Sequence, residues 1–82
     1  MDHQPGLKTS LIIKRSIVLH GHKTSVSLEN EFWNALHKIA EREQTTVSDL
    51  VGRIEHGSAT DNLSSAIRVF VLNHYRAKLK HP

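Results

Sequence analysis

The chain has 82 residues, no cysteine, and a net charge of +3 from 11 lysines and arginines against 8 acidic residues. This length fits one domain with a small core, and the lack of cysteine excludes disulfides, cysteine zinc ligands and cysteine nucleophiles. No apolar run approaches the roughly 20 residues that cross a bilayer, so we expect a cytoplasmic protein without membrane contact.

Charge is unevenly distributed along the chain. Residues 1–30 carry four cations against two acids, residues 31–56 carry five acids against three cations, and the segment after Gly57 carries four cations against one acid. A basic N-terminal segment suits a polyanionic partner, although an ordinary mixed surface has the same composition.

Residues 1–13 are expected to form a flexible N-terminal arm, because Pro5 and Gly6 lie among polar residues without periodicity. Residues 14–82 are then the folded domain. Lys14 to Leu19 is rich in β-branched residues and indicates a strand, and His20 to His22 indicates a turn.

Residues 23–28 form the second predicted strand, because apolar and polar side chains alternate along it. It could pair with residues 14–19 as a hairpin, or continue from them as one longer ribbon with a glycine bulge. The simplest partner is the same strand of a second molecule, and such a two-stranded ribbon fits the DNA major groove.

Three amphipathic helices follow. Asn30 is predicted to cap the first helix, which runs to about Glu43 and has an apolar stripe that includes Phe32 and Trp33. Thr46 caps the second helix with Asp49 three residues on, and Gly57 ends it. The third helix runs from Leu63 to about Leu79.

The order of these elements resembles the ribbon-helix-helix family. The resemblance rests on Thr24 to Glu29 before a tryptophan-containing helix and on Thr46 to Leu50 at the start of the next helix. The segments that indicate a subgroup are Arg15 to Ser16, Gly21 to Ser25 and Asn62 to Phe70. It implies a mainly α fold with a short β-ribbon: an intertwined homodimer with intermolecular antiparallel strands and an additional C-terminal helix. It also implies binding to double-stranded DNA, as a transcriptional repressor or an antitoxin-like regulator.

Carried over to this sequence, the family's base-reading positions are Lys23, Ser25 and Ser27, and its second contact is the start of the second helix, here Thr46, Val47 and Ser48. The amide groups of a first helical turn can hold a phosphate without a basic side chain. Independently of the family, Lys14 and Arg15 could neutralise phosphates, and His22 could stabilise the turn or face a phosphate. The expected dimer core is Thr24, Val26, Leu28, Trp33, Leu36, Leu50 and Ile54.

The main alternative is a homodimeric protein-interaction module with weak or no DNA binding, in which the C-terminal helix holds another protein. Serine side chains on the ribbon keep this alternative open, because they are short and pair with several bases. Seven histidines raise the question of metal binding, but no cysteine or nearby acid completes a ligand set around His20 and His22. We therefore expect no metal, no cofactor and no enzymatic activity.

Overall fold

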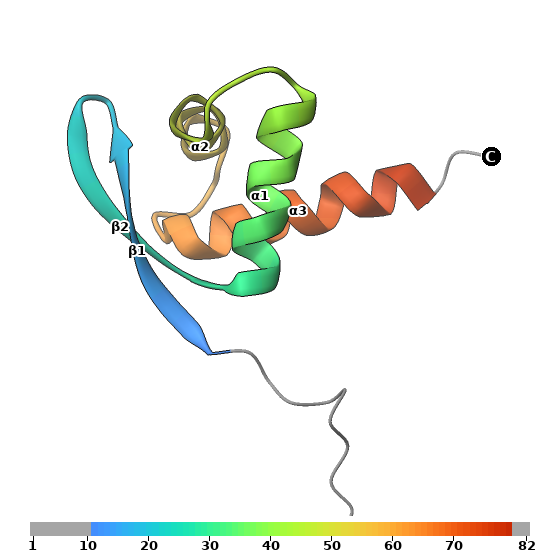
Figure 1. Ribbon diagram of the computed structural model, residues 1–82, viewed down its shortest axis with the longest axis horizontal. Coiled ribbons are helices and arrows are strands. Elements are labelled where there is room, and N and C mark those ends of the chain that lie inside the picture. The colour runs from blue at the N-terminus through green and yellow to red at the C-terminus, as the bar shows by residue number, and fades with distance from the viewer. Residues whose placement is uncertain (1–10, 80–82) are drawn as a thin grey trace, which may run out of the picture.

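A computed structural model describes residues 11–79 as a two-stranded sheet and three helices (Figure 1). The predicted N-terminal arm falls largely outside these residues. The hairpin lies along one side of the molecule and the helices lie on the other side of it (Figure 1). The elements, in chain order, are β1 (Ile12–Leu19), β2 (His22–Glu29), α1 (Asn30–Arg42), α2 (Val47–His56) and α3 (Leu63–Leu79).

The two strands pair with each other inside one chain. The antiparallel register runs from Ile12 opposite Glu29 to Leu19 opposite His22. His20 and Gly21 between them have φ values of 54° and 78°, and positive φ at both positions is the conformation of a type I′ turn, whose twist matches that of the strands. Of the two arrangements that the sequence left open, the hairpin is therefore correct.

The expectation that β2 pairs with the β2 strand of a second molecule is wrong. One edge of β2 is taken by β1, and α3 contacts the other edge. There the Ser27 amide donates to Ser64 Oγ at 2.9 Å, and Arg68 Nη2 donates to the Ser27 carbonyl oxygen at 3.1 Å. The sequence left the hairpin open as an alternative, but it did not indicate that α3 covers the second edge of β2. In addition, β1 begins at Ile12, inside the segment expected to be a flexible arm.

The first helix follows β2 without a loop and lacks the predicted cap. Glu29 occupies the N-cap position without a side-chain hydrogen bond to the helix, and Asn30 is already the first helical residue. The Asn30 side-chain oxygen instead accepts a hydrogen bond from Arg15 of β1. Asn30 therefore links the hairpin to the helix, which is a correction of the sequence prediction.

The other helix ends agree with the sequence. Thr46 Oγ1 accepts a hydrogen bond from the Asp49 amide at 3.0 Å, so Thr46 is the N-cap of α2. Gly57 is its C-cap. The third helix has the predicted bounds, and at its start the Asn62 side chain accepts from the Ser65 amide at 3.0 Å.

One hydrophobic core lies between the inner face of the hairpin and the three helices. Five of the residues predicted for a dimer core are buried within the single chain, and Thr24 and Trp33 are half-buried. These side chains are thus covered by their own chain, because the hairpin supplies a second strand that was expected from a partner. The five buried residues are Val26, Leu28, Leu36, Leu50 and Ile54.

The Arg68 guanidinium is held by Glu29 as well as by Ser27. Arg68 Nε lies 3.0 Å from Glu29 Oε1. The pKa of the Glu29 carboxyl is lowered from its ordinary value, mainly because the carboxylate accepts a hydrogen bond from the Glu29 backbone amide. Partial desolvation raises this pKa, whereas the hydrogen bond and the positive charge of Arg68 lower it further. The charged form of Glu29 therefore stabilises the contact between α3 and the edge of β2.

Replacing Thr46 with alanine is expected to lower the free energy of unfolding by about 1 kcal/mol, because the Asp49 amide loses its hydrogen-bond acceptor. Urea titration followed by circular dichroism measures this change. Thr46→Ser is the matched control and should retain most of the stability. Equal destabilisation of the two variants would contradict the role of the hydroxyl as a cap.

Glu29 makes stability depend on acid pH. Because its pKa in the folded chain lies below the ordinary value of 4.5, its contribution is present above that value and disappears as the pH falls through the folded pKa. Between about pH 7 and about pH 3, the stability of the wild type should therefore fall more than that of Glu29→Gln in urea titrations. An identical fall in both proteins would show that Glu29 does not contribute.

Candidate nucleic-acid interface

The hairpin has an outer face that points away from the helices. Register and alternation place four cross-strand pairs on it. One of them, Ile12 with Glu29, lies at the end of the hairpin away from the turn, and the other three pairs comprise six residues. Five of them are exposed and Ser27 is partly exposed. We call this set the outer face; its pairs are Lys14 with Ser27, Ser16 with Ser25, and Val18 with Lys23.

The outer face is basic. Within residues 11–79, neither Lys14 nor Lys23 forms a salt bridge. The acid at the end of this face, Glu29, is paired with Arg68. Two lysines and three serines thus lie on a ribbon two strands wide, with cations and hydroxyl groups available to a polyanion.

Arg15 does not join this set. It alternates to the inner face, where Nε and Nη2 lie 3.4 and 3.3 Å from the Leu28 carbonyl oxygen, and its guanidinium lies 5.0 Å from the centroid of the Trp33 ring. With Asn30 as a further acceptor, the guanidinium is committed to contacts inside the chain. Arg15 therefore positions the start of α1 against the hairpin.

The histidines of the turn have different environments. His22 is exposed and lies opposite Leu19 on the inner-face side of the register. His20 Nε2 lies 3.0 Å from Glu55 Oε1 of α2. This contact ties the tip of the hairpin to α2, a role of His20 that the sequence did not indicate.

The predicted contacts at the start of α2 lie near the turn rather than on the outer face. Ser48, together with residues 18–21, lines a depression of about 900 Å³ between the turn and α2. Thr46 is exposed, whereas Val47 and Ser48 are partly covered. The structure thus brings Lys14, Lys23, Ser25 and Ser27 together and leaves Thr46 to Ser48 on another side of the hairpin tip.

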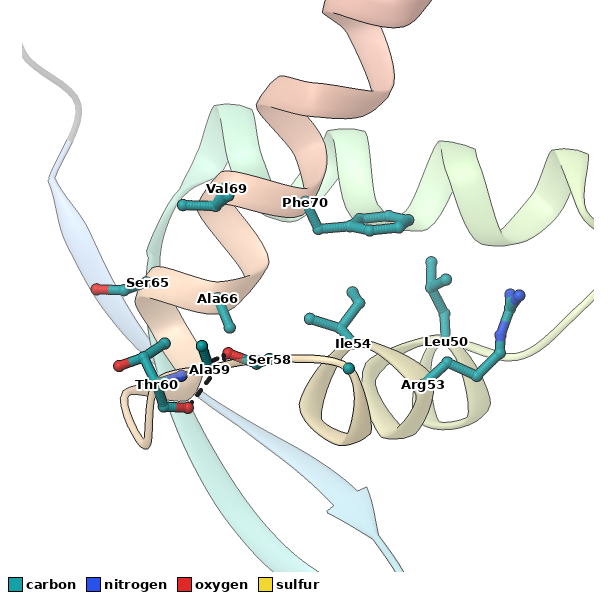
Figure 2. Close-up of a pocket in the computed structure, with 11 residues that line it drawn as sticks. Leu50, Arg53, Ile54, Ser58, Ala59, Thr60, Ser65, Ala66, Val69 and Phe70 are labelled. Atoms are coloured by element: carbon teal, nitrogen blue, oxygen red, sulfur yellow. Dashed lines mark hydrogen bonds between the residues drawn. The ribbon is translucent and has the colours of Figure 1, made fainter.

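A second concave feature is an apolar groove of about 530 Å³ between α2 and α3 (Figure 2). Leu50 and Ile54 of α2 point toward Phe70 of α3 across it. Val69 lines the groove, and Leu72 and Leu79 are further exposed apolar residues along α3. This groove was not predicted from the sequence; the available signal was that apolar residues of the third helix occupy more than one of its faces.

Ser16 and Val18 are members of the outer face that the sequence did not identify. Their side follows from the register, which the sequence did not determine, because Lys14 to Leu19 could have continued into one long ribbon. No group of three metal-ligating side chains occurs in the described part of the chain, residues 11–79. None of the helices in that range is long and apolar enough to span a membrane.

Comparisons with known proteins agree with this architecture. The family model for the ribbon-helix-helix domain matches residues 12–75. Among solved structures, an uncharacterized protein from Bordetella pertussis Tohama I is similar, with 33% sequence identity and a TM-score of 0.66; the match covers 87% of this chain and 62% of that protein. No curated protein matches the chain. Because the family model covers most of the chain, the protein belongs to the ribbon-helix-helix domain family, whose members are DNA-binding regulators.

Proposed function

We propose that this protein is a DNA-binding regulator, a transcriptional repressor or an antitoxin-like protein, that presents the outer face of its hairpin to the DNA major groove. The observation that supports this most is that two lysines and three serines lie together on the outer side of a two-stranded ribbon, and that neither lysine has an acidic partner within residues 11–79. The protein then acts by occupying its site on DNA and performs no chemistry.

The dimensions of the hairpin support this mode of binding. Neighbouring strands lie about 4.8 Å apart, and a two-stranded ribbon enters a major groove about 12 Å wide. Lys14 and Lys23 can reach guanine acceptors or phosphates, and the hydroxyls of Ser16, Ser25 and Ser27 can donate to or accept from base edges. In contrast to the sequence expectation, each chain supplies a complete ribbon by itself.

A phosphate contact at the start of α2 is a further part of the proposal. The Asp49 amide is taken by the Thr46 side chain, but a first helical turn has four amide groups without helical partners. The amides of Val47 and Ser48 can therefore hold a phosphate beside the hairpin tip, with exposed His22 next to the turn in sequence. The internal contacts of Arg15 favour a positioning role over phosphate binding.

A protein-interaction module is the second candidate function. The apolar groove between α2 and α3 and the exposed Leu72 and Leu79 support it, because exposed apolar surface of this kind is typical of protein contacts. In this alternative the outer face is an ordinary solvated surface. The same protein could combine both functions, as an antitoxin-like regulator requires.

Fluorescence anisotropy with mixed-sequence duplex DNA tests the proposal. Wild type should bind with an affinity that falls between about 50 and about 200 mM salt, because bound lysines release counterions from DNA. The double variant Lys14→Ala/Lys23→Ala should bind more weakly, and its salt dependence should fall by about 0.9 in logarithmic slope for each phosphate that the variant no longer neutralises.

Lys38→Ala/Lys78→Ala removes the same charge from exposed helix positions and is the matched control. It should bind DNA much more tightly than the outer-face variant. Equal weakening of both variants would mean that only total charge matters. No binding to any duplex at about 100 µM protein, the weak limit for non-specific binders, would favour the protein-interaction module.

A further inference from the structure

The outer face of the hairpin contains one apolar side chain, Val18, among polar ones. The neighbours of Val18 along β1, Ile17 and Leu19, face the core and are buried, whereas 53% of Val18 is exposed. On the face that is proposed to contact DNA, these methyl groups are therefore available to an apolar group of the ligand.

Val18 lies directly opposite Lys23 of β2. The Ser27 amide and carbonyl oxygen bind α3, so the strands do not exchange hydrogen bonds at the Lys14–Ser27 pair, and the same holds for every second pair along the ladder. Val18–Lys23 is such a pair, and in pairs of this kind the Cα atoms lie only about 4.5 Å apart. The methyl groups of Val18 and the side chain of Lys23 are therefore close neighbours near the turn.

The turn end of the outer side is the end suited to DNA. At the opposite end, Ile12 is also exposed, but it lies opposite the acidic Glu29, whereas Val18 lies opposite a cation. Val18 also borders the depression between the turn and α2, where the proposed function places a phosphate. A phosphate held there would bring the Val18–Lys23 pair against the neighbouring base edges.

We infer that Val18 reads the 5-methyl group of thymine while Lys23 binds a guanine in a neighbouring base pair. The inference rests on the DNA-binding function proposed above. In the major groove, thymine exposes a methyl group, cytosine exposes only an amino donor, and guanine presents two acceptors, O6 and N7. An aliphatic side chain beside an ammonium group therefore selects DNA in which thymine adjoins guanine.

The dimensions and energies of this contact fit. Base pairs stack about 3.4 Å apart, which is comparable with the Cα separation of about 4.5 Å in the Val18–Lys23 pair. Burial of one methyl group strengthens binding about fourfold. The next pair along the ribbon, Ser16 with Ser25, can bond with several bases and discriminates less. Val18 thus supplies sequence preference that the serines lack.

Replacement of thymine by uracil tests the contact, because uracil lacks only the 5-methyl group. The probe is a duplex of about 20 base pairs, roughly two helical turns, with alternating guanine and thymine in one strand. A second duplex has uracil in place of every thymine. In anisotropy titrations, wild type should bind the thymine duplex about fourfold more tightly. The ratio should be the same at about 50 and about 200 mM salt, since a methyl contact releases no counterions.

Variants at Val18 assign the preference to this side chain. Val18→Ser should bind the two duplexes equally, and Val18→Thr, which keeps β-branching and one methyl group, should retain part of the preference. Val69→Ser is the matched control, because Val69 on α3 is the same residue with a similar exposed fraction, 55%. It should keep the full preference. Circular dichroism spectra compare the folds of the three variants.

The converse experiment adds a methyl group to cytosine. In 5-methylcytosine this group occupies the position that it has in thymine. When every cytosine in a duplex of alternating guanine and cytosine is methylated, binding by wild type should strengthen and binding by Val18→Ser should not change. Absence of a gain in wild type would contradict a contact to the methyl group itself.

The possible failures are distinguishable. Equal affinity of wild type for the thymine and uracil duplexes would overturn the inference and leave DNA binding intact, and this comparison needs no variant to fold. A Val18→Ser that keeps the preference, or a Val69→Ser that loses it, would also overturn the inference. No binding to any of these duplexes at about 100 µM protein would contradict the proposed function, and the inference with it.

Discussion

The pairing of β1 with β2 inside one chain determines the rest of this structure. It depends on the turn at His20 and Gly21, where positive φ at both residues closes the hairpin in a fixed register. That register directs Ile17, Leu19, Val26 and Leu28 into the core. It also collects the lysines and serines on the opposite side, so the same hydrogen-bond ladder builds both the core and the candidate DNA-binding face.

Local sequence patterns predicted the elements that local interactions determine. The strand alternation at residues 23–28, the Thr46 cap and the bounds of the third helix are all confirmed, because each depends on residues close together in the chain. The same patterns gave the outward direction of Lys23, Ser25 and Ser27. Ribbon-helix-helix membership also followed from the order of these elements, and the family model confirms it.

What the sequence could not supply were contacts between distant residues. Asn30 has the chemistry of a helix cap, but Arg15 binds it across the hairpin. Ser64 and Arg68 contact the edge of β2 from 37 and 41 residues away from Ser27, and no pattern near Ser27 indicates this. The apolar residues assigned to a dimer core are covered instead by the chain's own helices and second strand, because burial alone does not reveal which chain provides the cover.

The central claim is that DNA meets the outer face of the hairpin, and amide chemical shifts measure this residue by residue. On titration of the labelled protein with duplex DNA, we expect the largest shift changes at Lys14, Ser16, Lys23 and Ser25, with small changes around the groove between α2 and α3. Shift changes concentrated at Leu50, Val69 and Phe70, with the hairpin unperturbed, would contradict the claim.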